Sequence, residues 1–93
     1  MVGKFVLVRT YSAGIHCGIL KSISGTEVLL GNSRRIWRWK GANTLSEMSV
    51  DGIDQIYSRI SEPVENILLT QSIEVIPCSD IAIENLSRSR WGQ

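Results

Sequence analysis

Glycine-containing turns divide the first 40 residues into short runs of β-branched and aromatic residues, and this spacing restricts the fold more than any other feature. Each run has the length of one strand, and its composition favours strands over helices. Because the intervening turns are short, successive strands are expected to pair antiparallel, as a meander. The predicted strands are residues 4–10, 15–23, 26–30 and 34–39, with turns at residues 12–14, 24–25 and 31–33.

A short helix is expected in the middle of the chain, where the strand pattern stops. Thr44 and Glu47 have the spacing of a capping box, in which the first residue caps the helix and the second reaches back toward it. Gly52 follows at a position that commonly ends a helix. The helix is therefore predicted to lie between Thr44 and Gly52.

Strand character returns in the second half of the chain, at residues 58–60 and 67–77. Pro63 lies between these two runs and fits only an edge or a bend, because proline has no N–H to donate. Pro77 is expected to end the last strand, and Ser79 to cap a second helix.

These elements predict a single domain over residues 1–93, of the mainly β (β-rich α+β) class. We expect a small, strongly bent antiparallel sheet or an SH3/Sm-like barrel, carrying one or two short helices. Bends are expected at Gly14, Gly18 and Gly25, since glycine accommodates bulges and tight corners. The segment VLVRTYSAGIHCGILKSISGTEVLLGNSRRI also resembles the start of Sm-like and SH3-like barrels. That resemblance implies a highly bent sheet and, by analogy, ring assembly.

The chain offers no evident set of residues for catalysis or metal binding. His16 is the only histidine, and strand alternation points Cys17 to the opposite face, so the two are poorly placed for nucleophilic chemistry. His16 is therefore expected at the surface or an interface. Cys17 and Cys78 form no CxxC motif and are predicted to be buried free thiols. We expect no catalytic residue, metal or cofactor, although carboxylates that converge in the fold to hydrolyse a nucleotide stay an open alternative.

The densest chemical feature is a run of arginine and tryptophan within residues 28–46, which contain no acid. Arginine binds phosphate through paired hydrogen bonds, and tryptophan offers a flat face on which a base can stack. This combination predicts a ligand-binding site. Its candidate residues are Arg34, Arg35, Trp37, Arg38, Trp39 and Lys40, with Arg9 and Tyr11 added from a neighbouring strand or subunit.

Strand alternation divides this run into two faces, so either Ile36 or the pair Trp37 and Trp39 points into the core. We favour buried tryptophans, because a buried Ile36 would carry long basic side chains into the core beside it. The tryptophans would then be mainly structural, and the arginines would reach the ligand. The exposed basic stripe would consist of Arg34, Arg38 and Lys40. The alternative is that the tryptophans form only core and the arginines only a solvated face.

The charges are distributed unevenly along the chain. Residues 1–46 carry seven basic residues and one acid, whereas residues 47–93 carry three basic and eight acidic residues. This asymmetry indicates either an anionic partner for the basic half or subunits that pair basic against acidic surface. The alternative is that folding mixes both halves on one surface. A net charge of only +1 makes a long polyanion the less favoured ligand.

Two sequence blocks resemble a family of small tailed-bacteriophage and prophage proteins. The blocks SRRIWRWKGANTLSEMSVDGI and ISEPVENILLTQSIEVIPCSDIA carry an Arg-Ile-Trp-x-Trp-x-Gly-Ala…Leu-Ser pattern and an Ile-Glu-x-Ile-Pro-Cys pattern. The family has no assigned function, so the resemblance implies an origin and not a reaction. A phage origin implies a protein of the host cytoplasm. We expect no membrane contact, because no apolar run approaches the roughly 20 residues of a membrane span.

Together these features favour a binding module over an enzyme. The first hypothesis is a phage-encoded homo-oligomer that sequesters a nucleotide-derived immune second messenger without cleaving it. Such a ligand would be of the cyclic oligonucleotide or cyclic ADP-ribose type, as used in the CBASS and Thoeris defence systems. The alternatives are a nucleic-acid-binding small barrel protein and a phage protein that is structural or binds a host protein.

Overall fold

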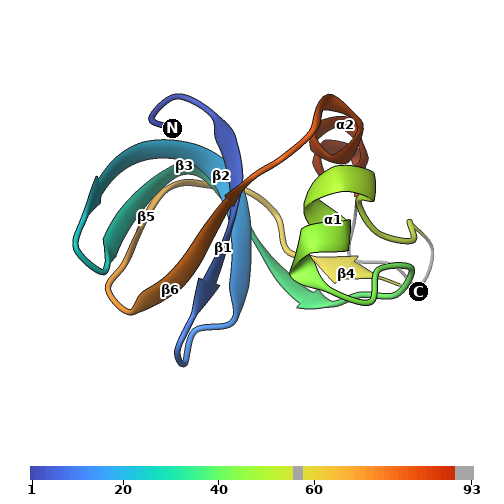
Figure 1. The fold of residues 1–93 in the computed structure, drawn as a ribbon, viewed down its shortest axis with the longest axis horizontal. Helices are drawn as coiled ribbons and strands as arrows, with labels where there is room; N and C mark the ends of the chain where they lie inside the picture. Colours follow the sequence, from blue (N-terminus) through green and yellow to red (C-terminus); the bar gives the residue numbers. More distant parts are fainter. Residues whose placement is uncertain (56–57, 90–93) are drawn as a thin grey trace.

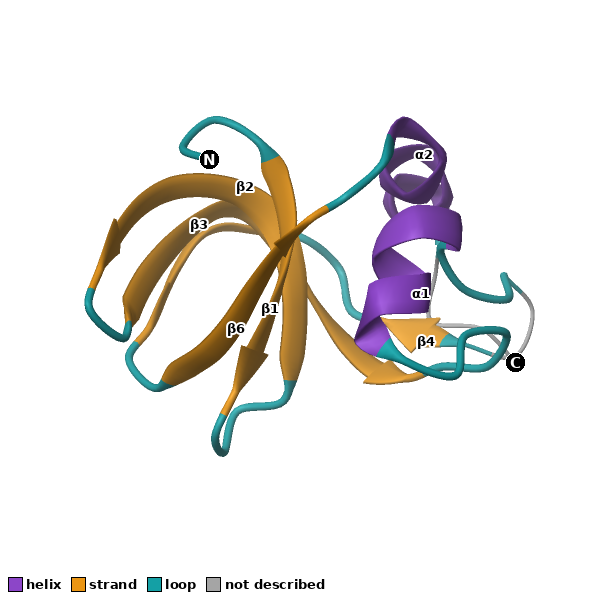
Figure 2. Ribbon diagram, viewed as in Figure 1, coloured by secondary structure: helices purple, strands orange, loops and turns teal. Residues whose placement is uncertain are grey.

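Six strands form one strongly bent antiparallel sheet with two short helices beside it, as Figures 1 and 2 show. The computed structural model describes residues 1–55 and 58–89. The strands are β1 (Phe5–Thr10), β2 (Ile15–Ser24), β3 (Glu27–Arg38), β4 (Arg59–Ile60), β5 (Val64–Leu69) and β6 (Ser72–Pro77), and the helices are α1 (Leu45–Asp51) and α2 (Asp80–Arg88). The sheet order is β4-β3-β2-β1-β6, and β5 pairs with another stretch of β3. The predicted mainly β fold is therefore confirmed.

The sheet curls until β5 and β6 are joined by a two-residue turn, but these two strands do not pair and the sheet does not close. β5 pairs with β3 and β6 pairs with β1, yet only residues 70–71 separate β5 from β6. The predicted single strand at residues 67–77 is therefore wrong, because the chain turns at Thr70 and Gln71. The carbonyl of Thr70 accepts a hydrogen bond from the Thr26 hydroxyl at 3.0 Å, which holds this turn against the β2–β3 turn. No ladder joins β5 to β6 in the described residues, so the sheet stays open instead of forming the barrel.

β3 continues without interruption through residues 31–33, where the sequence predicts a turn. The pairing of β2 with β3 shifts register between Cys17 and Ile19, which leaves one extra residue on β3. Asn32 has a positive φ of 52° there. Gly18 lies opposite, where a Cβ would come within 2.9 Å of a backbone carbonyl oxygen of β3. The bulge predicted at Gly18 is confirmed, and the predicted turn is instead a β-bulge inside a longer strand.

Side chains alternate along each strand, so the sheet contributes buried residues to a core on each of its two faces. On β1, Val6 and Val8 face the inside of the curl, and Leu7 faces the helices. We name the first cluster the sheet core; it contains Val6, Val8, Leu20, Val28, Leu30 and Leu69. We name the second cluster the helix core; it contains Leu7, Cys17, Ile36, Met48, Ile53, Ile60 and Leu86.

Both helices begin at the predicted caps. The Thr44 hydroxyl accepts a hydrogen bond from the Glu47 backbone N–H at 3.1 Å, and Ser79 caps α2 in the same way. The Glu47 carboxylate accepts from the backbone N–H of Asn43 at 3.3 Å, one residue before the position that the capping box predicts. Gly52 ends α1 with φ 81° and ψ −154°, as predicted.

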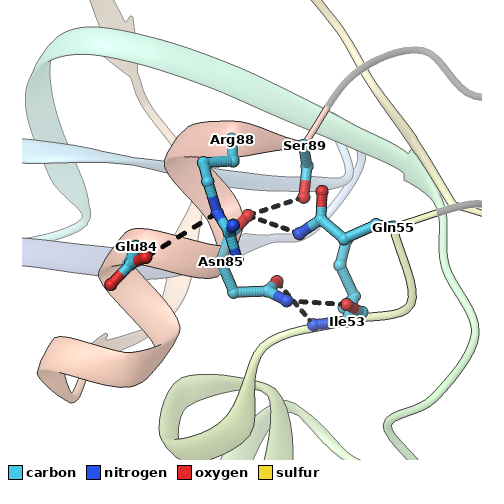
Figure 3. Close-up of polar contacts among 6 residues, drawn as sticks. All are labelled: Ile53, Gln55, Glu84, Asn85, Arg88 and Ser89. Carbon is cyan, nitrogen blue, oxygen red and sulfur yellow. Dashed lines mark hydrogen bonds and ion pairs between the residues drawn. The ribbon is translucent and has the colours of Figure 1, made fainter.

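Asn85 of α2 fixes the segment that follows α1, as Figure 3 shows. Its side-chain amide donates to the Ile53 carbonyl at 2.9 Å and accepts from the Ile53 N–H at 2.8 Å. Its backbone carbonyl accepts from the Gln55 amide at 2.7 Å and from the Ser89 hydroxyl at 2.8 Å. Gly52 packs so tightly here that a Cβ would overlap the Asn85 side chain. One amide side chain thus ties the end of α1 to α2.

Candidate small-ligand site

The central residues of the arginine–tryptophan run point in the direction opposite to the favoured prediction. Ile36 is 3% exposed and lies in the helix core, whereas Trp37 is 54% exposed. The predicted burial of Trp37 is therefore wrong. Ile36 pairs with Ile60 of β4, and both side chains fill the helix core, which leaves no place there for an indole at position 37.

The guanidinium of Arg34 donates to backbone carbonyls at the edge of the helix core. Arg34 can therefore lie on the same side of β3 as the buried Ile36 without burying an unpaired charge. Its Nε donates to the Ser61 carbonyl at 2.8 Å. Its terminal nitrogens donate to the carbonyls of Leu86 at 3.0 Å, Ser87 at 3.2 Å and Ser89. The last carbonyls of a helix have no partner within the helix, and a cation there also complements the helix dipole. Arg34 therefore holds the end of α2 on β3 and does not belong to an exposed basic stripe.

A second register shift, against β4, changes the alternation after Ile36. The shift lies between Ile36 and Arg38, so Trp37 is the extra residue and both Trp37 and Arg38 point outward. Trp39 then turns back and packs half-buried on the helix core, where its indole N–H donates to the Ala42 carbonyl at 3.2 Å. The predicted packing of Trp39 on the core and the predicted exposure of Arg38 and Lys40 are confirmed.

Arg9 and Tyr11 each have a partner outside the group of candidate residues. Arg9 pairs with Glu74 at 2.9 Å, so a charge from each half of the chain is neutralised there. Arg9 also shares its face of β1 with Leu7, which is the helix side of the sheet. Tyr11 is 77% exposed in the turn after β1, and its backbone N–H donates to the Gln71 carbonyl at 2.9 Å.

Arg35 instead lies beside a cavity of about 160 Å³ on the sheet-core side, which we name the rim pocket. His16 faces Arg35 across the β2–β3 pair and faces Val8 across the β1–β2 pair. Directly opposed residues share one face, so His16 and Arg35 point to the side of the sheet core. The rim pocket is lined by His16, Ser33, Arg35, Ser61, Val64 and Ile67.

His16 is 3% exposed, so its predicted place at the surface is wrong. Its Nε2–H donates to the Ala13 carbonyl at 3.0 Å, which leaves Nδ1 of the neutral ring as an acceptor. Nδ1 is buried and has no partner within the described part of the chain. Burial lowers the pKa of His16 and the Arg35 charge lowers it further, against the opposing effect of the Ala13 hydrogen bond. The imidazole is therefore neutral at pH 7.

Ser33 brings a second buried polar group to the same cavity. It is 1% exposed, and its hydroxyl also lacks a partner among residues 1–55 and 58–89. Ser33 follows the bulge residue Asn32, and the bulge sets its direction, so no local sequence signal identifies Ser33 as a site residue. Ser61 supports the same wall, since its hydroxyl accepts from the Arg35 backbone N–H at 2.9 Å.

The Arg35 guanidinium lies 4.0 Å from the centroid of the Trp37 ring. Its other neighbour is Gly14, where a Cβ would approach Arg35 Nε to 3.2 Å. The guanidinium forms no hydrogen bond or ion pair with the described residues, so its N–H donors remain available. A cation held on an indole next to a partly polar cavity suits a ligand that combines an anionic group with a flat ring.

A larger groove of about 580 Å³ lies near the end of α2 but has weaker chemistry. Its inner cation is Arg34, whose guanidinium already donates to four carbonyls. Its other basic residue is Arg88, which is exposed. The rim pocket, with its two unpartnered buried polar groups, is therefore the stronger candidate site.

A family model described as a domain of unknown function, DUF6948, matches residues 3–86. The chain belongs to this family. The match covers the rim pocket and Arg34, and it includes all of β1 to β6. No curated protein and no solved structure matches the DUF6948 chain significantly.

Three other properties of the DUF6948 domain bear on its chemistry. The described residues contain no group of three or more His, Cys, Asp and Glu side chains that could hold a metal ion. No helix in the described ranges is long and apolar enough to cross a membrane. Burial raises the pKa of Cys17 to about 12 and that of Cys78 to about 11, so both free thiols stay protonated at neutral pH.

Acid is expected to destabilise the protein through His16. Its pKa is lowered in the folded state, so the unfolded chain, with an ordinary pKa of 6.5, binds the proton more readily. The contribution of His16 to stability is therefore complete above about pH 6.5 and declines as the pH falls below it. Urea unfolding between pH 8 and 5 should show that the free energy of unfolding falls less steeply with pH for His16→Gln than for the wild type. An equally steep fall in both proteins would contradict this expectation.

Proposed function

We propose that this protein is a phage-encoded, homo-oligomeric binding protein of the host cytoplasm that sequesters a nucleotide-derived immune second messenger without cleaving it. The observation that best supports this proposal is the Arg35–Trp37 pair beside the rim pocket. The guanidinium offers donors to a phosphate, and the half-exposed indole offers a surface for stacking. The phage origin is supported by the resemblance of the blocks at residues 33–53 and 60–82 to phage and prophage proteins.

The size of the rim pocket supports a shared site between copies of the chain. Its volume of about 160 Å³ equals that of about five water molecules. Pockets that enclose a drug-sized ligand are typically about 300–1,000 Å³. A cyclic oligonucleotide would therefore place only one part in this pocket, and a second copy of the chain would cover the remainder.

Calorimetry against a panel of cyclic dinucleotides, cyclic trinucleotides and cyclic ADP-ribose isomers tests the proposal. We expect at least one ligand to bind and to be recovered intact by chromatography. Arg35→Gln and Trp37→Ala should each weaken that binding by about tenfold or more, since each removes a contact of about 1–3 kcal/mol. Arg88→Gln is the matched control, because Arg88 is an exposed arginine outside the rim pocket.

Three outcomes would overturn the proposal. If no ligand of the panel bound, a small second messenger of these types would be excluded. Co-purified nucleic acid, with binding that falls steeply as salt rises, would favour a nucleic-acid-binding protein instead. Stoichiometric recovery of one host protein, without any nucleotide binding, would favour a protein-interaction role. Light scattering with and without ligand tests the oligomer, and a monomer in the ligand-bound state would contradict a shared site.

A further inference from the structure

Two residues that line the rim pocket each carry a buried side-chain polar atom without a partner in the described part of the chain. Three side-chain atoms of this kind occur in the described residues: His16 Nδ1, Ser33 Oγ and Ser72 Oγ. His16 and Ser33 line the rim pocket, whereas Ser72 lies outside it. His16 and Ser33 come from adjacent strands. Ser33 lies two residues before Arg35, which faces His16, so strand alternation places Ser33 on the same side as His16.

An unpartnered polar group inside a protein lowers stability, because it loses its hydrogen bonds to water without replacement. Replacing such a group by an apolar one of similar shape is commonly neutral or stabilising. Sites that bind ligands often retain groups of this kind at the expense of stability. Two in one small cavity therefore point to a ligand that supplies the missing partners.

The hydrogen-bonding character of the two groups identifies the kind of ligand. His16 Nδ1 can only accept, because Nε2 carries the proton that binds the Ala13 carbonyl. The Ser33 hydroxyl can donate as well as accept. A phosphodiester, or a phosphate monoester above its second pKa of about 6, presents acceptors only, so it cannot satisfy Nδ1 of a neutral imidazole. A nucleobase carries N–H or amino donors next to carbonyl or ring-nitrogen acceptors on one edge, and this pattern complements both groups.

The walls of the pocket also suit a flat ring. Val64 and Ile67 of β5 supply apolar surface, and ligand pockets typically combine such walls with a few placed polar groups. Arg35 lies at the same cavity, with its guanidinium against Trp37. A base inside would therefore leave its sugar and phosphate on the side of Arg35 and Trp37.

We infer that the rim pocket binds the donor–acceptor edge of a nucleobase through His16 Nδ1 and the Ser33 hydroxyl, while Arg35 holds the phosphate outside it. This inference rests on the proposed function, since it assumes a nucleotide-derived ligand. The inference goes beyond the proposed function in two respects: the base of the ligand enters the pocket first, and the base is the part that the pocket recognises.

The pH dependence of binding distinguishes a base from a phosphate in the pocket. Protonation of His16 turns Nδ1 from an acceptor into a donor. The charged group that faces His16 is Arg35 of β3, while Val8 of β1 and Val64 and Ile67 of β5 are apolar. No carboxylate among them would reverse the effect. Because the pKa of His16 lies below 6.5, a base should bind more weakly as the pH falls below that value and His16 is protonated, whereas a phosphate should bind more tightly.

The test follows backbone amide chemical shifts of the full chain during titration with adenosine, guanosine, cytidine and uridine, and separately with ribose 5-phosphate. At least one nucleoside should shift the His16 and Ser33 amides at pH 8 and lose affinity at lower pH. Ser33→Ala should weaken nucleoside binding by about tenfold, which corresponds to one lost hydrogen bond. Its unfolding free energy should stay equal or rise, because an unpartnered hydroxyl is removed. Ser72→Ala is the matched control and should bind as the wild type does.

The outcomes separate this inference from the proposed function. If ribose 5-phosphate occupies the rim pocket and tightens at low pH, the base-reading inference is wrong and nucleotide binding stands. Equal affinities of Ser33→Ala and Ser72→Ala for the same nucleotide would lead to the same conclusion. If neither the nucleosides nor any member of the cyclic nucleotide panel binds, both the inference and the proposed function are wrong.

Discussion

Replacing Arg34 by methionine should lower the free energy of unfolding by about 2–4 kcal/mol, the largest effect we expect from a single side chain in the arginine–tryptophan run. Methionine keeps an unbranched apolar stem but provides no donor. The carbonyls of Ser61, Leu86, Ser87 and Ser89 would each lose their guanidinium partner. For a domain of this size, the loss corresponds to a fall in Tm of roughly 10–20 °C.

Arg38→Met is the matched control for Arg34→Met. It removes an exposed arginine from the same strand, and its effect on stability should stay within about 0.5 kcal/mol. Arg34→Lys should restore only part of the loss, because an ammonium cannot reach several diverging carbonyls at once. Thermal unfolding followed by circular dichroism measures all three variants. Equal stability of Arg34→Met and Arg38→Met would refute the structural role of Arg34.

Gly52→Ala should destabilise the protein by about 2–4 kcal/mol through two separate effects. The backbone at Gly52, with φ 81° and ψ −154°, lies in a region that is almost restricted to glycine. The added methyl group would also overlap the Asn85 side chain and displace it from both hydrogen bonds with Ile53. The two effects can be separated, because only the second depends on Asn85.

A double-mutant cycle measures that separation. Asn85→Ala alone should cost about 1–3 kcal/mol, since the backbone of Ile53 loses both partners. In the double variant the overlap is absent. The loss of unfolding free energy in the double variant should therefore be smaller than the sum of the two single losses by about 1 kcal/mol or more. Gly25→Ala is the control for a side chain at a positive φ without any overlap, because Gly25 has a φ of 60° and no atom lies within 4 Å of an added Cβ. Additive costs for Gly52 and Asn85 would show that the two do not interact.

Local sequence patterns were sufficient to predict much of this fold. The caps Thr44 and Ser79 act on amides within three residues, so the signal and its partner are adjacent in the chain. The turn at residues 31–33 was wrongly predicted, because glycine and asparagine favour a bulge as readily as a turn. Pairing with one long partner strand, β2, decides between the two, and that pairing is not visible locally. The turn at residues 70–71 was missed for a similar reason: it follows from which strands β5 and β6 pair with.

The candidate site was less predictable than the fold. Arg35 and Trp37 were identified by their residue types, but the sequence offered no reason to separate Arg35 from Arg34. Their roles differ because adjacent residues of a strand face opposite sides, and only Arg34 faces the end of α2. The rim-pocket atoms of His16 and Ser33 were missed, since a lone histidine and a lone serine in strands carry no motif. Their importance lies in the absence of partners, which only the packed structure reveals.

Because most partners of Arg34 lie near the end of the chain, the contacts of Arg34 cannot form until late in synthesis. β3 leaves the ribosome well before residues 86–89, whose carbonyls the Arg34 guanidinium binds. β1 likewise waits for β6, so its outer edge has no neighbour until most of the chain has been translated. A nascent chain therefore carries a cation and a strand edge that stay partly uncovered until its last third has been made. The unfinished protein is more exposed to association with other chains than the finished one.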